Sequence, residues 1–122
     1  MTAPEMVCHL SDAFRIAMGE IRVPEASTFM SRSVVKWIAL YAPLKWPHGT
    51  PTPPECDQKK AGTKAADFLE DREKLNHLIE RFANAQGRPA WGIHPFFGTM
   101  TDRDWLRWGY LHVDHHLRQF GA

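Results

Sequence analysis

Residues 101–121, TDRDWLRWGYLHVDHHLRQFG, decide the predicted fold, because they combine a helix signal with a pair of histidines. Thr101 fits a helix cap, and Asp102 and Asp104 fall in the first turn, where acidic side chains suit the positive end of the helix dipole. Apolar residues then recur at helical spacing. We therefore predict a helix that begins after Thr101 and runs almost to Gly121.

Two histidines lie on the flank of this predicted helix. With a turn of about 100° per residue, His112 and His116 lie together beside Trp105, whereas His115 points nearly opposite. This spacing lets both imidazoles coordinate a single ion. An isolated pair of this kind is equally consistent with two surface or capping side chains. The apolar face itself is predicted to contain Leu106, Gly109, Tyr110, Val113, Leu117 and Phe120.

The N-terminus predicts a second helix that bears a histidine. Thr2 and Glu5 form a capping-box pattern, so this helix begins after Thr2 and ends near Gly19. His9 falls at the edge of its apolar arc, where an isolated histidine is more often a hydrogen-bonded core residue than a ligand. The side predicted to face away from that arc contains Glu5, Cys8, Ser11, Asp12 and Arg15.

Two further helices and a long loop complete the predicted fold. A short, largely apolar helix is expected over residues 27–41, and a longer one over about residues 65–85. Residues 43–63 are rich in proline, which excludes regular helix, although Trp46 favours packing of this loop against the body. Because no strand pattern or internal repeat occurs, we expect an all-α bundle that forms one domain over residues 1–122.

The remaining histidines are weaker candidates for a site. His77 lies opposite the apolar side of the predicted 65–85 helix, which includes Phe68, and should be solvated. His48 is most simply a surface residue of the proline-rich loop. His94 precedes a proline, which favours extended backbone there, but the pattern does not set the direction of its ring.

Composition and charge exclude several classes of function. The chain has 122 residues, with 15 basic and 14 acidic side chains and a formal net charge of +1, so no strong field attracts nucleic acid or anionic lipid. Cys8 and Cys56 lack the spacing of a thiolate zinc site or a disulfide framework. The N-terminus has neither a basic region nor an uninterrupted apolar stretch. We therefore expect a cytoplasmic protein that binds neither nucleic acid nor membranes.

His9, His112 and His116 together form a candidate metal site. Three neutral imidazoles suit a divalent transition metal and leave positions open for water or substrate, and they accept zinc, nickel, iron and copper alike. Such an ion activates water or a thiol as a nucleophile at neutral pH. His94 and Trp105 are candidates for lining a pocket beside the ion, and the pattern identifies no catalytic base.

The same positions carry a resemblance to a known family. MVCHL around His9, HPFFGTMT at residues 94–101 and HVDHHLRQFG at residues 112–121 resemble an uncharacterised bacterial branch of the DinB-like superfamily of metal-binding helical bundles. This resemblance covers nearly the whole chain. It implies a four-helix bundle in which His9, His112 and His116 bind a divalent metal, and relatives that act as metal-dependent thiol transferases or isomerases.

The chain departs from that family pattern at its N-terminus. Members carry a long helix before the one with the first histidine, whereas this sequence begins almost at the cap of the helix that bears His9. Either the native start lies upstream, or a second copy covers the face that the missing helix would cover. Because an uncovered apolar face is unfavourable, we expect a homodimer.

Three interpretations of function stay open at this point. The leading one is a metal-dependent enzyme, transferring thiol or other small groups or acting as a hydrolase on a small molecule. The alternative is a non-enzymatic helical bundle that binds a metal or a ligand. In the third, the histidines bind no metal and satisfy buried hydrogen bonds. An apolar wall for a ligand is predicted from Trp91, Phe96, Phe97, Trp105 and Trp108.

Overall fold

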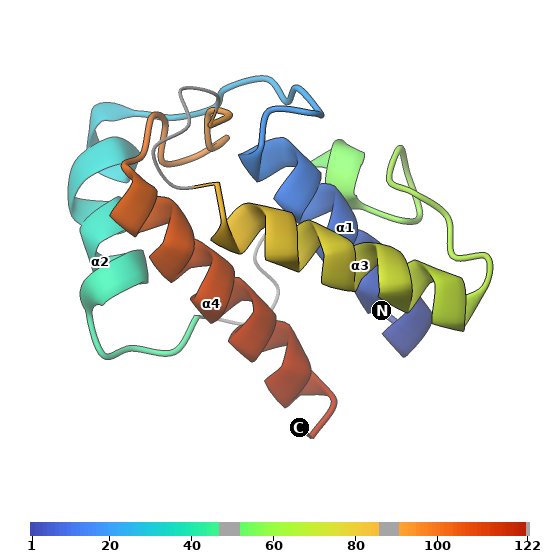
Figure 1. Cartoon of the computed structure of the whole chain (residues 1–122). Coiled ribbons are helices and arrows are strands. Elements are labelled where there is room, and N and C mark those ends of the chain that lie inside the picture. Colours follow the sequence, from blue (N-terminus) through green and yellow to red (C-terminus); the bar gives the residue numbers. More distant parts are fainter. Residues whose placement is uncertain (47–51, 86–90, 122) are drawn as a thin grey trace.

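The computed structural model describes residues 1–46, 52–85 and 91–121, and these residues form helices and no strand (Figure 1). This confirms the all-α prediction for the described ranges. No helix among them combines the length and the apolar character needed to span a membrane. The α-helices are α1 (Ala3–Ala17), α2 (Lys36–Tyr41), α3 (Phe68–Ala83) and α4 (Asp102–Gln119), with a π-helical turn η1 (Ser31–Val35) and a 3-10 turn η2 (Pro54–Cys56) between them.

The two predicted helix caps are present. The Thr2 hydroxyl accepts from the backbone N–H of Glu5 at 3.3 Å, and the Glu5 carboxylate accepts from the N–H of Thr2 at 2.9 Å. Thr101 and Asp104 form the same reciprocal pair at the start of α4. These caps satisfy backbone donors that the helices leave unpaired, so both histidine-bearing helices begin where the sequence predicts.

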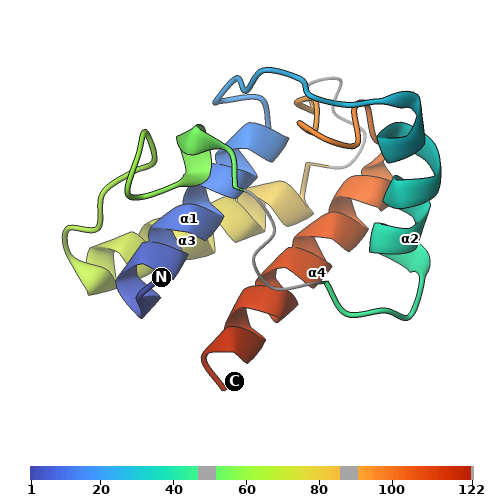
Figure 2. The ribbon, with the colours of Figure 1, turned by 180° about the vertical axis from the view of Figure 1, so that it is seen from behind.

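Helix α1 is the centre of the fold and is buried on more than its apolar side. It packs against α3, α4 and η2, and α3 and α4 lie beside it in the views from front and back (Figures 1 and 2). The prediction that Cys8, Ser11 and Asp12 face away from the core is wrong, because each is at most 4% exposed. A single apolar face is expected of a helix on the surface, whereas α3 and the chain around η2 enclose α1 from the other side.

Asp12 shows how this second side of α1 is satisfied. Its carboxylate accepts from the backbone N–H of Thr63 at 2.8 Å, from the Thr63 hydroxyl at 2.7 Å and from the Gln58 amide at 3.0 Å. Arg15 lies 3.2 Å from the same carboxylate. The buried charge is therefore paired and hydrogen-bonded, and it fastens the loop around η2 to α1.

The buried face of α4 differs from the predicted one. Tyr110, Leu117 and Phe120 are 63%, 41% and 43% exposed, whereas Trp105 and Trp108 are buried. Gly109 explains part of the rotation, since a Cβ there would lie 2.5 Å from Cε1 of Phe82 on α3. The close approach at this glycine and the large tryptophans turn α4 so that the flank bearing the histidines faces inward.

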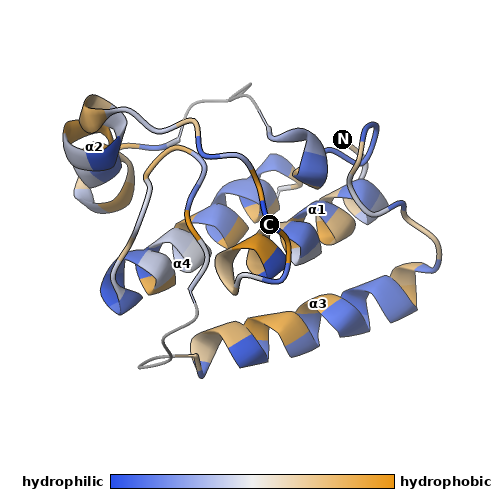
Figure 3. Cartoon of the chain, turned by 90° about the horizontal axis from the view of Figure 1, so that it is seen from above, coloured by the Kyte–Doolittle hydropathy of each residue, from blue (hydrophilic) through white to orange (hydrophobic). Residues whose placement is uncertain are grey.

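The predicted helix at residues 27–41 is present in altered form. It contains the π-helical turn η1, which has no cap made by a side chain, and continues as α2 at the edge of the molecule (Figure 3). We call residues 29–44 the edge segment. Its exposed apolar side chains are Phe29, Met30, Val34, Val35, Trp37, Ile38 and Leu44.

Helix α3 and the proline-rich loop agree with the prediction in part. α3 begins at Phe68, after the cap residue Asp67, and Phe68 is 43% exposed instead of lying on the buried side. Trp46 packs against the body as expected, and its indole N–H donates to the carbonyl of Ala39 at 2.7 Å. His48 and the predicted stop signals Gly87 and Pro89 lie outside the described residues.

Candidate metal centre

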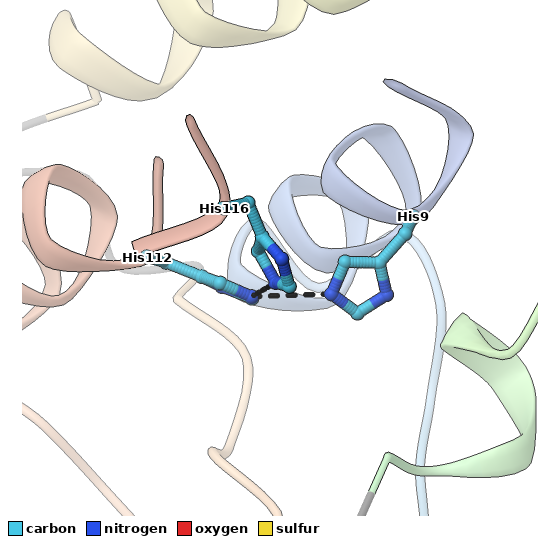
Figure 4. Close-up of side chains that lie close together, drawn as sticks. All are labelled: His9, His112 and His116. Carbon is cyan, nitrogen blue, oxygen red and sulfur yellow. Dashed lines mark hydrogen bonds between the residues drawn. The ribbon is translucent and has the colours of Figure 1, made fainter. Parts of the chain in front are cut away.

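Three histidine rings from opposite ends of the chain converge in the fold. His9 comes from α1, and His112 and His116 come from α4; their side chains point toward one another (Figure 4). Nε2 of His112 lies 3.2 Å from Nε2 of His9 and 3.1 Å from Nε2 of His116. One ring nitrogen from each of the three lies within 4.8 Å of those of the others. The structure thus brings together the three residues that the sequence selects.

The outward nitrogens of two of these rings are held by oxygen acceptors. Nδ1–H of His9 donates to the backbone carbonyl of Cys56 in η2 at 2.9 Å. Nδ1–H of His116 donates to Oε1 of Gln119, one turn further along α4, at 2.9 Å. Because a carbonyl oxygen accepts only, the Nε2 atoms of neutral His9 and His116 carry lone pairs that face the centre of the cluster.

His112 is held differently. Its Nδ1 is buried and has no hydrogen-bond partner among the described residues. The ring packs edge-on against Trp108, with centroids 5.0 Å apart, and Trp46 lies on another side at 5.8 Å. Packing between two tryptophans, and not a hydrogen bond, therefore fixes this ring.

Burial keeps the three imidazoles neutral. It lowers the pKa of His116 to about 4, and it also lowers the pKa of His9, where the bond to the Cys56 carbonyl opposes it. The pKa of His112 lies well below its usual value, first because of burial and then because His9 and His116 are neighbours. Neutral imidazole is the form that ligates metals.

Hydrogen bonding among the rings does not satisfy their lone pairs. With Nδ1 protonated in His9 and His116, His112 supplies at most one proton to two Nε2 acceptors at 3.2 and 3.1 Å. A cation at the centre would accept all three lone pairs. Two nitrogens that bind a tetrahedral ion at ordinary Zn–N distances lie roughly 3.3 Å apart, which is close to the separations found here. The donor set therefore fits a divalent transition metal.

A large cavity opens beside the three histidines. Its volume is about 1010 Å³, and His94 and Trp105, the two residues predicted to line a pocket here, are among its walls. Phe96, Phe97 and Trp108 line it as well, whereas Trp91, also expected in an apolar wall, is not among the lining residues. The volume is at the upper end of the range for small-molecule sites.

His94 presents a neutral N–H group at this cavity. Its Nδ1 accepts from the backbone N–H groups of Phe96 and Phe97, both at 3.1 Å, within a tight turn closed by the bridge between His94 and Gly98. Gly98 has φ +69, a conformation that favours glycine. Burial lowers the pKa of His94 to about 4, so the neutral ring carries its proton on Nε2. No described residue accepts from that N–H, and the atom is not sealed from the cavity.

The other candidate residues lie outside the cluster. His77 is exposed, as predicted. His115, predicted to point away, contacts Gln119 through Nε2 at 3.3 Å and lines the cavity without joining the three. Cys8 and Cys56 are free and buried, and burial raises their pKa values to about 11 and 12, so neither supplies a thiolate at neutral pH.

Sequence reasoning missed three contributors to this site. Gln119 follows His116 by three residues, and that spacing is a usable signal for a contact on one helix face. The carbonyl of Cys56 carries no signal, since every residue has one. Trp46 was expected to pack on the body, but nothing in its sequence context linked it to His112.

The fold and the cluster define an all-α protein with a histidine triad at the mouth of an apolar cavity. The chain belongs to the DUF1569 family, which is described as a protein of unknown function and whose model matches residues 6–122. No curated protein matches the chain, and neither does any solved structure.

Proposed function

We propose that this protein binds a divalent transition metal through His9, His112 and His116 and acts on a small molecule, as a thiol-dependent transferase or a related enzyme. The observation that supports it is the convergence of three Nε2 atoms whose rings are neutral and held from behind. A bound ion would supply Lewis-acid chemistry and lower the pKa of a thiol or water beside it. The metal is zinc, nickel or iron, and the donor set alone does not distinguish them.

The chain's own residues have separate parts in this proposal. His9 and His116 are oriented by the Cys56 carbonyl and by Gln119, an arrangement that raises ligand basicity and fixes the tautomer. Trp108 excludes water from one side of His112. His94 supplies a neutral hydrogen-bond donor to a substrate oxygen in the cavity.

Metal analysis of the purified protein tests the proposal. We expect about one equivalent of transition metal in protein purified without added metal, or after titration with Zn²⁺ or Co²⁺. His112→Ala and His116→Ala should each weaken binding by more than about 100-fold, and Gln119→Ala by roughly 10- to 100-fold. His77→Ala, an exposed histidine, is the matched control. Unchanged metal affinity in both α4 variants would overturn the proposal.

A second candidate function is non-enzymatic binding of a metal or ligand. It is favoured by the walls of the cavity, since none of the described lining residues is Asp, Glu, Tyr or Lys, the common general bases other than histidine. Access to the ion separates the two functions. Exchangeable water on the loaded metal, detected by relaxation or by anion binding, supports catalysis, whereas a closed coordination sphere supports a structural or regulatory metal.

We also propose that the chain is a shortened DinB-like four-helix bundle that pairs with a second copy. Seven exposed apolar side chains of the edge segment, from Phe29 to Leu44, support self-association. Two free, buried cysteines are consistent with the reducing conditions of the cytoplasm. A stable monomer at micromolar concentration in sedimentation equilibrium would overturn the dimer.

A further inference from the structure

The walls of the cavity restrict the chemistry of whatever occupies it. Among the described residues that line it, none is Asp, Glu, Lys or Arg. A carboxylate or phosphate placed away from the triad would therefore lose its hydration without gaining an opposite charge, which is strongly unfavourable. Charge on a ligand is compatible with this cavity only at the end that faces the histidines.

Aromatic side chains make up much of the remaining wall. The ring of Phe97 stacks on His94 with centroids 4.3 Å apart, and Trp105 and Trp108 meet edge to face at 5.2 Å. The residues come from α4 and from the turn at residues 94–98, which lie on opposite sides of the cavity. Such rings bury the faces of an aromatic or branched aliphatic group and add a preference for stacked or edge-on contact.

The polar groups of the cavity lie where a ligand needs only a few of them. At one end are the Nε2 atoms of the triad, and the N–H of His94 is separated from His112 by the ring of Trp108, which contacts both. A π-helical turn, a feature frequent at functional sites, contributes Ser31 and Val35 to the wall. The cavity thus combines one metal-binding end with a body that is apolar except for neutral donors and acceptors.

From this arrangement we infer that the cavity binds a small molecule with an aromatic or branched apolar body, no charge on that body, and one group that coordinates the metal. The inference rests on the proposed metal site. It disfavours thiols that carry several charged groups, such as glutathione, and favours an apolar thiol or an apolar acid as the natural ligand class.

A pair of hydroxamates with one metal-binding group and different bodies tests the inference. The protein is first loaded with Co²⁺, whose visible absorption reports coordination, and is then titrated with acetohydroxamate and with benzohydroxamate. Each affinity is corrected for the affinity of that hydroxamate for free Co²⁺. We expect benzohydroxamate to bind about tenfold more tightly or better, because its phenyl ring is buried against the aromatic wall.

Two variants locate the preference in the cavity. Phe96→Ala removes a half-buried ring from the wall but keeps the backbone N–H that donates to His94. It should reduce the preference for benzohydroxamate severalfold and leave acetohydroxamate unchanged. Phe68→Ala is the matched control, since Phe68 is 43% exposed on α3 and does not line the cavity.

The outcomes separate this inference from the proposed function. Stoichiometric Co²⁺ binding with equal affinities for the two hydroxamates, or tighter binding of glutathione than of phenylmethanethiol, overturns the inference alone. Failure to bind Co²⁺ overturns the proposed function and the inference with it. A preference for benzohydroxamate that persists in Phe96→Ala and disappears in Phe68→Ala would place the apolar subsite elsewhere and overturn the inference as well.

Discussion

Helix α1 and the edge segment both contain long runs of apolar residues, yet the fold treats them in opposite ways. In α1 even Asp12 is 1% exposed, and Phe14 is 2% exposed. In the edge segment Phe29 is 76% and Trp37 is 60% exposed, and Leu40 is the only residue from Ser31 to Tyr41 that is buried. Apolar composition therefore does not decide which helix forms the core.

Position within the assembly decides it. α1 has α3, α4 and η2 around it, whereas α2 and η1 contact chiefly each other and one side of α4. Polar residues of α1 become buried because loops bring them partners, as Thr63 does for Asp12. The comparison teaches that the number of neighbours, and not the moment of a single helix, sets burial in this small fold.

The largest expected effect comes from truncating the centre of α1. Phe14→Ala removes a ring that meets Phe82 at 4.8 Å and Trp108 at 5.8 Å, and should lower the free energy of unfolding by about 3–5 kcal/mol. Urea denaturation followed by tryptophan fluorescence measures it. A loss below about 1 kcal/mol would contradict the central position of α1.

Asp12→Asn should have the next largest effect, because an amide places donors opposite the donors of Thr63 and Gln58. We expect a loss of roughly 1.5–3 kcal/mol in the free energy of unfolding, and weaker metal binding, since the loop that Asp12 holds also carries the Cys56 carbonyl. Asp57→Asn, in the same loop but partly exposed, is the control and should change stability little.

A smaller effect concerns pH and the buried histidines around α1, which the edge segment lacks. His94 has a folded pKa of about 4 against an ordinary value of 6.5, so its contribution to stability is complete above about pH 6.5 and is lost as the pH falls toward 4. At most about 1.4 kcal/mol per pH unit is lost in this way. His94→Asn keeps an acceptor for the N–H groups of Phe96 and Phe97 and does not titrate.

Unfolding free energies of metal-free wild type and His94→Asn, measured from pH 7.5 to 5, check this prediction. The variant should lose less stability than wild type as the pH falls. Parallel pH profiles would show that His94 is not buried in its neutral form.

The smallest effect is expected in the edge segment. Trp37→Ser changes a 60% exposed side chain between residues of similar helix propensity, and should alter the stability of the monomer by less than about 0.5 kcal/mol. If a second copy covers the segment, the wild type alone should gain stability with increasing protein concentration. A loss of several kcal/mol at low concentration would remove the contrast with α1.

Local signals in the sequence predicted the parts of the fold that depend on near neighbours. Thr2 with Glu5 and Thr101 with Asp104 place the starts of α1 and α4, because capping involves residues three apart. Helical spacing also placed His112 and His116 on one flank. Whether the triad holds a metal stays a prediction.

The parts that were not predicted depend on distant packing. The inward turn of Trp108, in place of Tyr110 and Leu117, follows from the contact of Gly109 with Phe82, which no local pattern contains. The burial of Ser11 and Cys8 likewise follows from coverage of α1 by segments more than 40 residues away, among them Asp71, which lies 3.7 Å from the Cys8 sulfur.

The group that orients His9 is a main-chain carbonyl, that of Cys56. Side-chain replacement at position 56 cannot delete this acceptor, so its retention depends on the path of η2 and not on the identity of the residue. Selection on the metal centre would therefore leave position 56 free to vary, within the limits of a buried volume. Variation there among related chains would be compatible with a fully retained site, whereas a change in the length of the loop around η2 would not.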